Sequence, residues 1–168
     1  MRARFPIYWS APPCRDCACC PRPSPSLPLP RFPRKPPAGY RHWFHVNTMI
    51  IDKASLLFKD LGGMHNVYVN AVGEAALKKG GPYPDKSMFV TDLHDFTVSD
   101  GSYVEGARKG LAVMVKDSKK YASTGGWGFQ FWEGGDPKKP QVTDAAKQCF
   151  ACHQPKKDQD YVYSTYIP

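Results

Sequence analysis

The sequence holds 168 residues with a formal net charge of +8 and a mean hydropathy of −0.49. A uniformly basic chain would suggest a nucleic-acid partner, but the charge here is uneven. Residues 1–37 carry seven basic side chains and one acidic side chain, so they account for +6 of the +8. Residues 38–168 are nearly neutral, which argues against nucleic-acid binding by this part. No apolar run in the sequence reaches the length of a membrane span.

Residues 1–37 form a region of distinct composition, with 11 of the 17 prolines and four of the six cysteines. Proline lacks an N–H group and has a fixed φ angle, so this density predicts a disordered tail outside the mature domain. The cysteines follow a C-x-x-C-x-C-C pattern, at Cys14, Cys17, Cys19 and Cys20. Such a pattern can hold zinc or copper, but no histidine or predicted scaffold accompanies it, and it is not assigned a role.

Residues 38–168 are the size of one domain. The spacing of small and apolar residues predicts a helix over 67–79, ended by Gly80 and Gly81. Thr143 or Asp144 is placed to cap a short helix further on. Alternating apolar residues and aromatic side chains predict extended segments at 40–51, 88–98, 111–115, 127–132 and 161–166. Strands with short connections and a few helices are typical of an α+β domain, mainly an antiparallel β-sheet.

The sequence Cys149-Phe150-Ala151-Cys152-His153 is a C-x-x-C-H motif. Two thiols at this spacing can each add across one vinyl group of a haem and form two thioether bonds. The histidine that follows is then placed to bind the iron from the proximal side. The motif predicts one haem c per chain, attached through Cys149 and Cys152 and ligated by His153, with the α+β domain packed around it.

A structural zinc site or a thiol redox pair would use the same two cysteines. Zinc needs four ligands, and no second C-x-x-C lies at the distance of a zinc finger or ribbon. A thioredoxin-like pair is typical of a βαβ context, which the residues before Cys149 do not predict. Haem c attachment is therefore the favoured interpretation.

Several short motifs occur together in residues 40–168 in a fixed order. They are Tyr40-Arg41-x-Trp43, His65-Asn66-Val67-Tyr68-Val69, Tyr83-Pro84-Asp85, Val115-Lys116-Asp117, the Gly-Gly-Trp at 125–127, the haem motif and Asp160-Tyr161-Val162-Tyr163. In this order the chain resembles the cytochrome P-460 family, which includes the related β-sheet cytochromes c′. The resemblance covers residues 40–168 and none of residues 1–37.

The resemblance implies an antiparallel β domain around one c-type haem, with histidine below the iron and an open position above it, and a homodimer. It also implies a periplasmic location, because haem c is attached outside the cytoplasm in bacteria. Residues 1–37 lack the apolar core of a signal peptide, so we expect the start site to be misplaced or a leader to be missing.

Two positions depart from the hydroxylamine-oxidising members of the family. Those members join a lysine covalently to the haem, and the matching position here is Thr91. They also have a distal carboxylate, and the matching position is Ala112. Neither a threonine nor an alanine side chain can supply that cross-link or accept the proton. We therefore expect Thr91, Ala112 and Met114 to line an apolar distal pocket.

Other residues near the haem have simpler interpretations. Phe89, Phe129, Phe131, Trp127 and Trp132 are expected to bury the porphyrin faces. His65 and His94 are expected to be surface or hydrogen-bonded groups, and Glu105 to pair with Arg108. Met64 or Met114 would be the source of any sixth, thioether ligand.

Three functions follow from these residues. The first is a haem protein with five-coordinate iron that binds a small gaseous or nitrogenous ligand such as nitric oxide or carbon monoxide. The second is an oxidoreductase that acts on hydroxylamine or nitric oxide. The third is a periplasmic electron carrier with a small redox protein as its partner. Thr91 and Ala112 favour the first over the second, and no clear second axial ligand supports the third.

Overall fold

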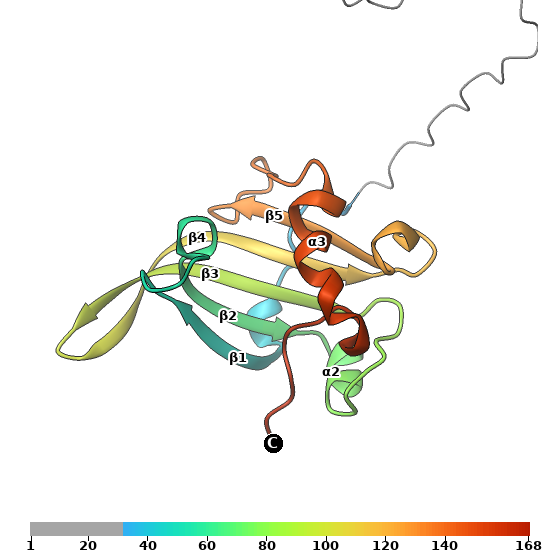
Figure 1. Cartoon of the computed structure of the whole chain (residues 1–168), viewed down its shortest axis with the longest axis horizontal. Helices are drawn as coiled ribbons and strands as arrows, with labels where there is room; N and C mark the ends of the chain where they lie inside the picture. The colour runs from blue at the N-terminus through green and yellow to red at the C-terminus, as the bar shows by residue number, and fades with distance from the viewer. Residues whose placement is uncertain (1–31) are drawn as a thin grey trace, which may run out of the picture.

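Alternating apolar and polar residues build one five-stranded antiparallel sheet in the computed structural model, which describes residues 32–168 (Figure 1). The strands pair in chain order, as β1 (Phe44–Ile51), β2 (Gly63–Val69), β3 (Met88–Ser99), β4 (Ser102–Lys116) and β5 (Trp127–Glu133). The long hairpin of β3 and β4 projects beyond the other strands in Figure 1. The predicted α+β class with a mainly antiparallel sheet is confirmed.

Short helices connect and cover the strands. Those before β5 are η1 (Tyr40–His42), α1 (Phe58–Leu61), α2 (Ala71–Leu77) and η2 (Ala122–Thr124). The last three run on without a break, as η3 (Ala146–Phe150), α3 (Ala151–His153) and η4 (Gln154–Gln159). We call these three together the C-terminal helical segment. It crosses one face of the sheet, in front of the strands in Figure 1. No helix within residues 32–168 is long and apolar enough to cross a membrane.

Strand register defines which side chains share the face under the C-terminal helical segment, here called the helical face. Directly paired residues project to the same side of a sheet. One such row consists of Val67, Thr91, Ala112 and Phe131, and the next of Val69, Phe89, Met114 and Phe129. The second row belongs to a buried cluster against which Cys149 and Phe150 pack, so both rows lie on the helical face.

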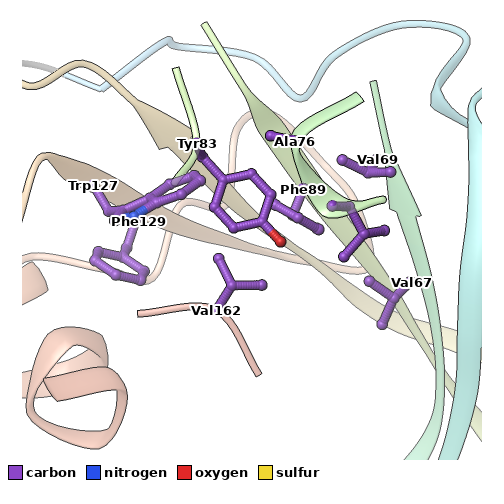
Figure 2. Packing of buried hydrophobic residues seen from close by; sticks show 9 residues of the cluster. Val67, Val69, Ala76, Tyr83, Phe89, Trp127, Phe129 and Val162 are labelled. Carbon is purple, nitrogen blue, oxygen red and sulfur yellow. The ribbon is translucent and has the colours of Figure 1, made fainter. Parts of the chain in front are cut away.

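The core of the helical face is aromatic. The ring of Tyr83 lies between Phe89 and Trp127, with centroid distances of 5.2 Å and 5.7 Å (Figure 2). Val162, from the chain after the C-terminal helical segment, approaches the same cluster. These contacts join the turn before β3, two strands and the C-terminus into one packed unit.

The opposite face of the sheet is built around a buried carboxylate. Asp92 is fully buried and accepts hydrogen bonds from Tyr40 Oη at 2.7 Å, Arg41 Nη2 at 2.7 Å and Arg108 Nε at 2.7 Å. Burial opposes ionisation of Asp92, but the hydrogen bonds from Arg108, Tyr40 and Arg41 outweigh it and lower its pKa to about 2. His94 Nε2 lies 2.9 Å from the same carboxylate.

Two predicted elements are wrong in part. Residues 67–69 belong to β2 and not to a helix, because Val67 and Val69 alternate with Tyr68 and pack as strand residues. The helix begins after Asn70, whose side chain accepts a hydrogen bond from Gly73 N at 3.0 Å. Residues 161–166 form no strand, since they lie over the helical face and pair with no sheet edge.

The predicted pairing of Glu105 with Arg108 is also wrong. Arg108 binds Asp92, and Glu105 accepts a hydrogen bond from Asn66 Nδ2 at 2.6 Å. Two irregularities in the pairing of β3 and β4, on either side of His94, shift the register of this hairpin. Spacing along one strand therefore did not predict the partners.

Most of the predicted tail, residues 1–31 with the four N-terminal cysteines, lies outside the described residues. Its last part, residues 32–37, is described. Phe32 packs against Trp132 and Tyr121, with centroid distances of 5.8 Å and 6.3 Å. The structure thus gives one residue of the predicted tail a contact with the sheet.

Candidate functional site

The C-x-x-C-H motif lies in the C-terminal helical segment, across η3 and α3. Two hydrogen bonds from backbone N–H groups to side chains stabilise the start of this segment. Asp144 Oδ1 accepts from Lys147 N at 3.2 Å, and Gln148 Oε1 accepts from Thr143 N at 2.8 Å. These bonds satisfy backbone groups that have no partner in the first turn, so the predicted cap at Thr143 or Asp144 is confirmed at Asp144. Cys149 and Cys152 are three residues apart and therefore lie on one side of the helix.

The imidazole of His153 is oriented by the chain that follows it. His153 Nδ1 lies 2.8 Å from the Tyr161 carbonyl oxygen. A carbonyl oxygen can only accept, so Nδ1 carries the proton and Nε2 presents a lone pair. Burial lowers the pKa of His153, while the bond to the carbonyl acts in the opposite direction. The neutral imidazole, the form that binds metals, is therefore favoured.

Aromatic rings surround His153. The Phe129 and Tyr163 rings have centroids 5.1 Å and 5.2 Å from the imidazole. Tyr163 Oη also donates to the Cys152 carbonyl at 2.6 Å, which ties the C-terminal chain to the motif. The imidazole thus sits between a strand of the helical face and the chain that covers it.

The two cysteines differ in exposure and neither forms a disulfide within residues 32–168. Cys152 is exposed, whereas Cys149 is half-buried and burial raises its pKa to about 11. A thiol with so high a pKa is a poor redox nucleophile. Across the described part of the chain no three histidine, cysteine or acidic side chains come together as a metal site. The raised pKa of Cys149 therefore argues against a thiol redox pair.

Comparison with known proteins places the chain in a family. The family model described as Cytochrome P460 matches residues 37–164. The chain belongs to the cytochrome P460 family. Membership implies a c-type haem cofactor, and the members of the family are typically periplasmic. No curated protein matches the chain.

In this member of the cytochrome P460 family, the three residues predicted to line the distal pocket share the helical face. Thr91 pairs directly with Ala112, and Met114 pairs with Phe129, the residue that contacts the imidazole of His153. All three are half-buried. The two rows are two residues apart along β4, a separation of roughly 7 Å.

Other predicted residues lie elsewhere. Trp132 is buried on the opposite face with Val90 and Leu111, so it cannot be part of a wall on the helical face. Met64 pairs with His94 on that opposite face, which excludes it as an axial ligand on the helical side. His65 is buried, with Nε2 2.7 Å from the Leu61 carbonyl oxygen, as expected of a hydrogen-bonded group.

Sequence reasoning missed the residues that support His153. Phe150 packs against Tyr161, with ring centroids 5.1 Å apart. Tyr161 contributes the carbonyl oxygen described above, and the preceding Asp160 accepts a hydrogen bond from Lys116 Nζ at 2.6 Å. One signal in the sequence could have identified them. Lys116 and Asp160 both occur in the short motifs that carry the family resemblance, and neither residue had an assigned role.

A cleft of about 590 Å³ lies apart from these residues, between the chain around α1 and the β3–β4 hairpin. Its lining includes Phe58, Phe96, Tyr103 and Lys109, and none of the predicted site residues. This cleft is therefore separate from the motif.

Proposed function

We propose that this chain carries one haem c and binds a small neutral ligand, such as nitric oxide or carbon monoxide, at an open position of its iron. Cys149 and Cys152 would each add sulfur and hydrogen across one vinyl group, and His153 Nε2 would be the proximal ligand. Two thiols at the attachment spacing and one imidazole with its lone pair available fit this cofactor. The haem supplies the ligand-binding iron.

The composition of the helical face supports ligand binding over oxidation of hydroxylamine. Its two central rows consist of Val67, Thr91, Ala112 and Phe131, and of Val69, Phe89, Met114 and Phe129. None of these eight side chains is an acid, a histidine or a lysine. A surface of this kind excludes water and offers no group to accept a proton from a bound substrate.

The pairing of Thr91 with Ala112 is the observation that carries the proposal. In the hydroxylamine-oxidising relatives, a haem-linked lysine and a distal carboxylate are expected at these two positions. The two functions act at one haem, and the two positions lie directly opposite each other on one face. The strand register of the sheet therefore supports the matching of these two positions to the family pattern.

Optical spectroscopy of the purified, exported protein tests the proposal. We expect covalently bound haem that acid acetone does not extract, and a broad high-spin spectrum after reduction. Carbon monoxide and nitric oxide should each shift the Soret band with saturable binding. A red-shifted Soret band before any ligand is added would instead indicate a cross-linked haem. Sharp α and β bands without ligand would indicate six-coordinate iron.

A second function follows from the family itself, whose membership favours an oxidoreductase that acts on hydroxylamine or nitric oxide. Steady-state hydroxylamine oxidation with an artificial electron acceptor distinguishes it from ligand binding. Robust turnover by the unmodified protein would contradict the first proposal and support this one. Electron transfer is a third possibility, with Met114 as the thioether ligand on the helical face.

The setting of the protein is proposed on the same basis. Attachment of haem c requires export in bacteria, so we infer a periplasmic location. The family resemblance favours a homodimer, and it is compatible with a small redox protein as a partner. Size-exclusion chromatography with light scattering on the haem-loaded protein would measure the oligomeric state directly.

A further inference from the structure

The backbone that orients His153 has an unfavourable conformation. Asp160 and Tyr161 are consecutive and both left-handed, with φ angles of 49° and 66°. Aspartate tolerates this region, but a residue such as tyrosine rarely adopts it outside a turn held by its surroundings. This turn directs the Tyr161 carbonyl oxygen at His153 Nδ1. The end of η4 holds part of the turn, since Asp160 N donates to the Lys157 carbonyl oxygen at 3.0 Å and Tyr161 N to the Lys156 carbonyl oxygen at 2.8 Å. Further contacts come from more distant parts of the fold.

Three hydrogen bonds fix Asp160, and each comes from a different part of the fold. Lys116 Nζ, at the end of β4, donates to Asp160 Oδ1 at 2.6 Å. The backbone N–H of Tyr83 donates to Asp160 Oδ2 at 2.9 Å. The indole Nε1 of Trp127 donates to the Asp160 carbonyl oxygen at 2.8 Å. Figure 2 shows Tyr83 and Trp127 next to each other in the aromatic core of the helical face.

The ion pair within this group is nearly enclosed. The side chains of Lys116 and Asp160 are 8% and 15% exposed. Lys116 Nζ also lies 5.0 Å from the centre of the Trp127 ring and donates to the Gly125 carbonyl oxygen at 3.2 Å. An enclosed pair of this kind is sensitive to the loss of either partner, because the other charge is left without compensation.

The turn before β5 requires a glycine at position 125. A Cβ atom at Gly125 would collide with the ring of Tyr161, and its φ of 65° is itself left-handed. The glycine therefore leaves space for the ring whose own carbonyl meets His153. The Gly-Gly-Trp, Val-Lys-Asp and Asp-Tyr motifs of the sequence thus converge on one turn.

We propose that Lys116 and Asp160 are positioning residues for the proximal histidine. By holding the left-handed turn, they keep the Tyr161 carbonyl against Nδ1 and so fix the ring orientation and the strength with which Nε2 donates to iron. The inference rests on the proposed function, since it requires His153 to ligate the haem iron. Neither residue touches the imidazole, and both act through the backbone of Tyr161.

The test is resonance Raman spectroscopy of the reduced, haem-loaded protein, with the iron–histidine stretching frequency as the readout. Lys116→Met and Asp160→Ala should each lower this frequency and raise the fraction of five-coordinate nitrosyl complex formed with nitric oxide. Asp160→Asn should shift the frequency less, because an amide oxygen can still accept from Tyr83 N and asparagine tolerates the left-handed region.

Two control variants separate positioning from stability. Asp158→Asn changes an exposed carboxylate in the same segment that forms no ion pair within residues 32–168, and should leave the frequency unchanged. Arg41→Gln weakens the buried Asp92 group on the opposite face and should lower the melting temperature without moving the frequency.

The outcomes distinguish this inference from the function on which it rests. A wild-type protein without an iron–histidine mode, or with a mode that survives His153→Ala, contradicts the proposed function. A wild-type mode that Lys116→Met and Asp160→Ala leave unchanged, while the melting temperature falls, overturns the positioning role alone.

Discussion

The opposite face of the sheet surrounds a buried carboxylate with hydrogen-bond donors from the protein, whereas the helical face leaves one polar atom without a partner in the described part of the chain. On the opposite face, the Asp92 carboxylate binds Tyr40, Arg41 and Arg108 within 2.7 Å. On the helical face, His153 uses Nδ1 for a backbone carbonyl, and Nε2 has no hydrogen-bond partner among residues 32–168. One face is built for stability and the other keeps an imidazole nitrogen available for a ligand.

This difference separates two kinds of variant. Changes at the Asp92 group should lower stability with little effect on ligand chemistry. Changes in the motif or in the rows of the helical face should alter haem attachment or reactivity first. The comparison would be wrong if changes at the Asp92 group altered ligand chemistry first, or if changes on the helical face mainly lowered stability.

The largest effect is expected from removing both attachment thiols. Cys149→Ser with Cys152→Ser leaves no sulfur to form a thioether, so covalently bound haem should be lost completely. Haem staining of a denaturing gel measures this directly. Cys152→Ser alone should retain one thioether and partial staining. Full staining of the double variant would contradict the assignment of the motif.

Removing the centre of the opposite face should have the next largest effect. Asp92→Ala leaves two guanidinium groups and a tyrosine hydroxyl without their acceptor, and should lower the free energy of unfolding by about 3–5 kcal/mol. Urea unfolding of the haem-loaded protein measures the change. Asp95→Ala, at an exposed carboxylate three residues further on, should change it by less than about 0.5 kcal/mol. Carbon monoxide affinity of the surviving folded Asp92→Ala protein should match the wild type, and a large loss would break the separation of the two faces.

The same carboxylate predicts a dependence of stability on pH. The pKa of Asp92 is lowered from 3.8 to about 2 in the folded protein, so its ionised form stabilises the fold above the unfolded value. That contribution should be lost as the pH falls from about 4 to about 2. Urea midpoints measured across this range should fall more steeply in the wild type than in Asp92→Asn. Equal slopes would show that Asp92 does not control acid stability.

Introducing a carboxylate on the helical face should change chemistry more than stability. Ala112→Glu places an acid in the row of Thr91 and Phe131, and should raise hydroxylamine oxidation by roughly 10²-fold over a low wild-type rate. Steady-state assays with an artificial electron acceptor measure this change. Ala75→Glu, at an exposed position of α2, is the matched control and should have no effect. An inactive Ala112→Glu protein with intact haem would place the distal position elsewhere.

Local signals predicted the parts of the structure that local chemistry determines. The strands over 88–98, 111–115 and 127–132 were expected from aromatic and β-branched residues in alternation, and all three lie within observed strands. The attachment motif was recognisable because its chemistry depends on a spacing of a few residues. The cap at Asp144 followed for the same reason.

Long-range partners could not be predicted in this way. Tyr40 meets Asp92 across 52 positions, and Lys116 meets Asp160 across 44. The expected strand at 161–166 failed because its apolar residues pack on the helical face instead of pairing with a sheet edge. The expected pair of Glu105 with Arg108 failed because irregular pairing in the hairpin turned Arg108 toward Asp92.

The smallest expected effect concerns the boundary of the folded domain. Phe32 falls in the region predicted to be a dispensable tail, yet its ring packs on Trp132 and Tyr121 of the opposite face. Exported proteins that begin at Phe32 and at Ala38 should both bind haem, because the motif lies on the other side of the sheet. The shorter protein should lose about 1 kcal/mol of unfolding free energy, the contribution of a partly buried aromatic ring. Phe32→Ala in the full chain should reproduce that loss if the ring is responsible. Equal stability of all three proteins would show that residues 32–37 do not contribute to the stability of the domain. Loss of haem in the shorter protein would show that the two faces are not independent.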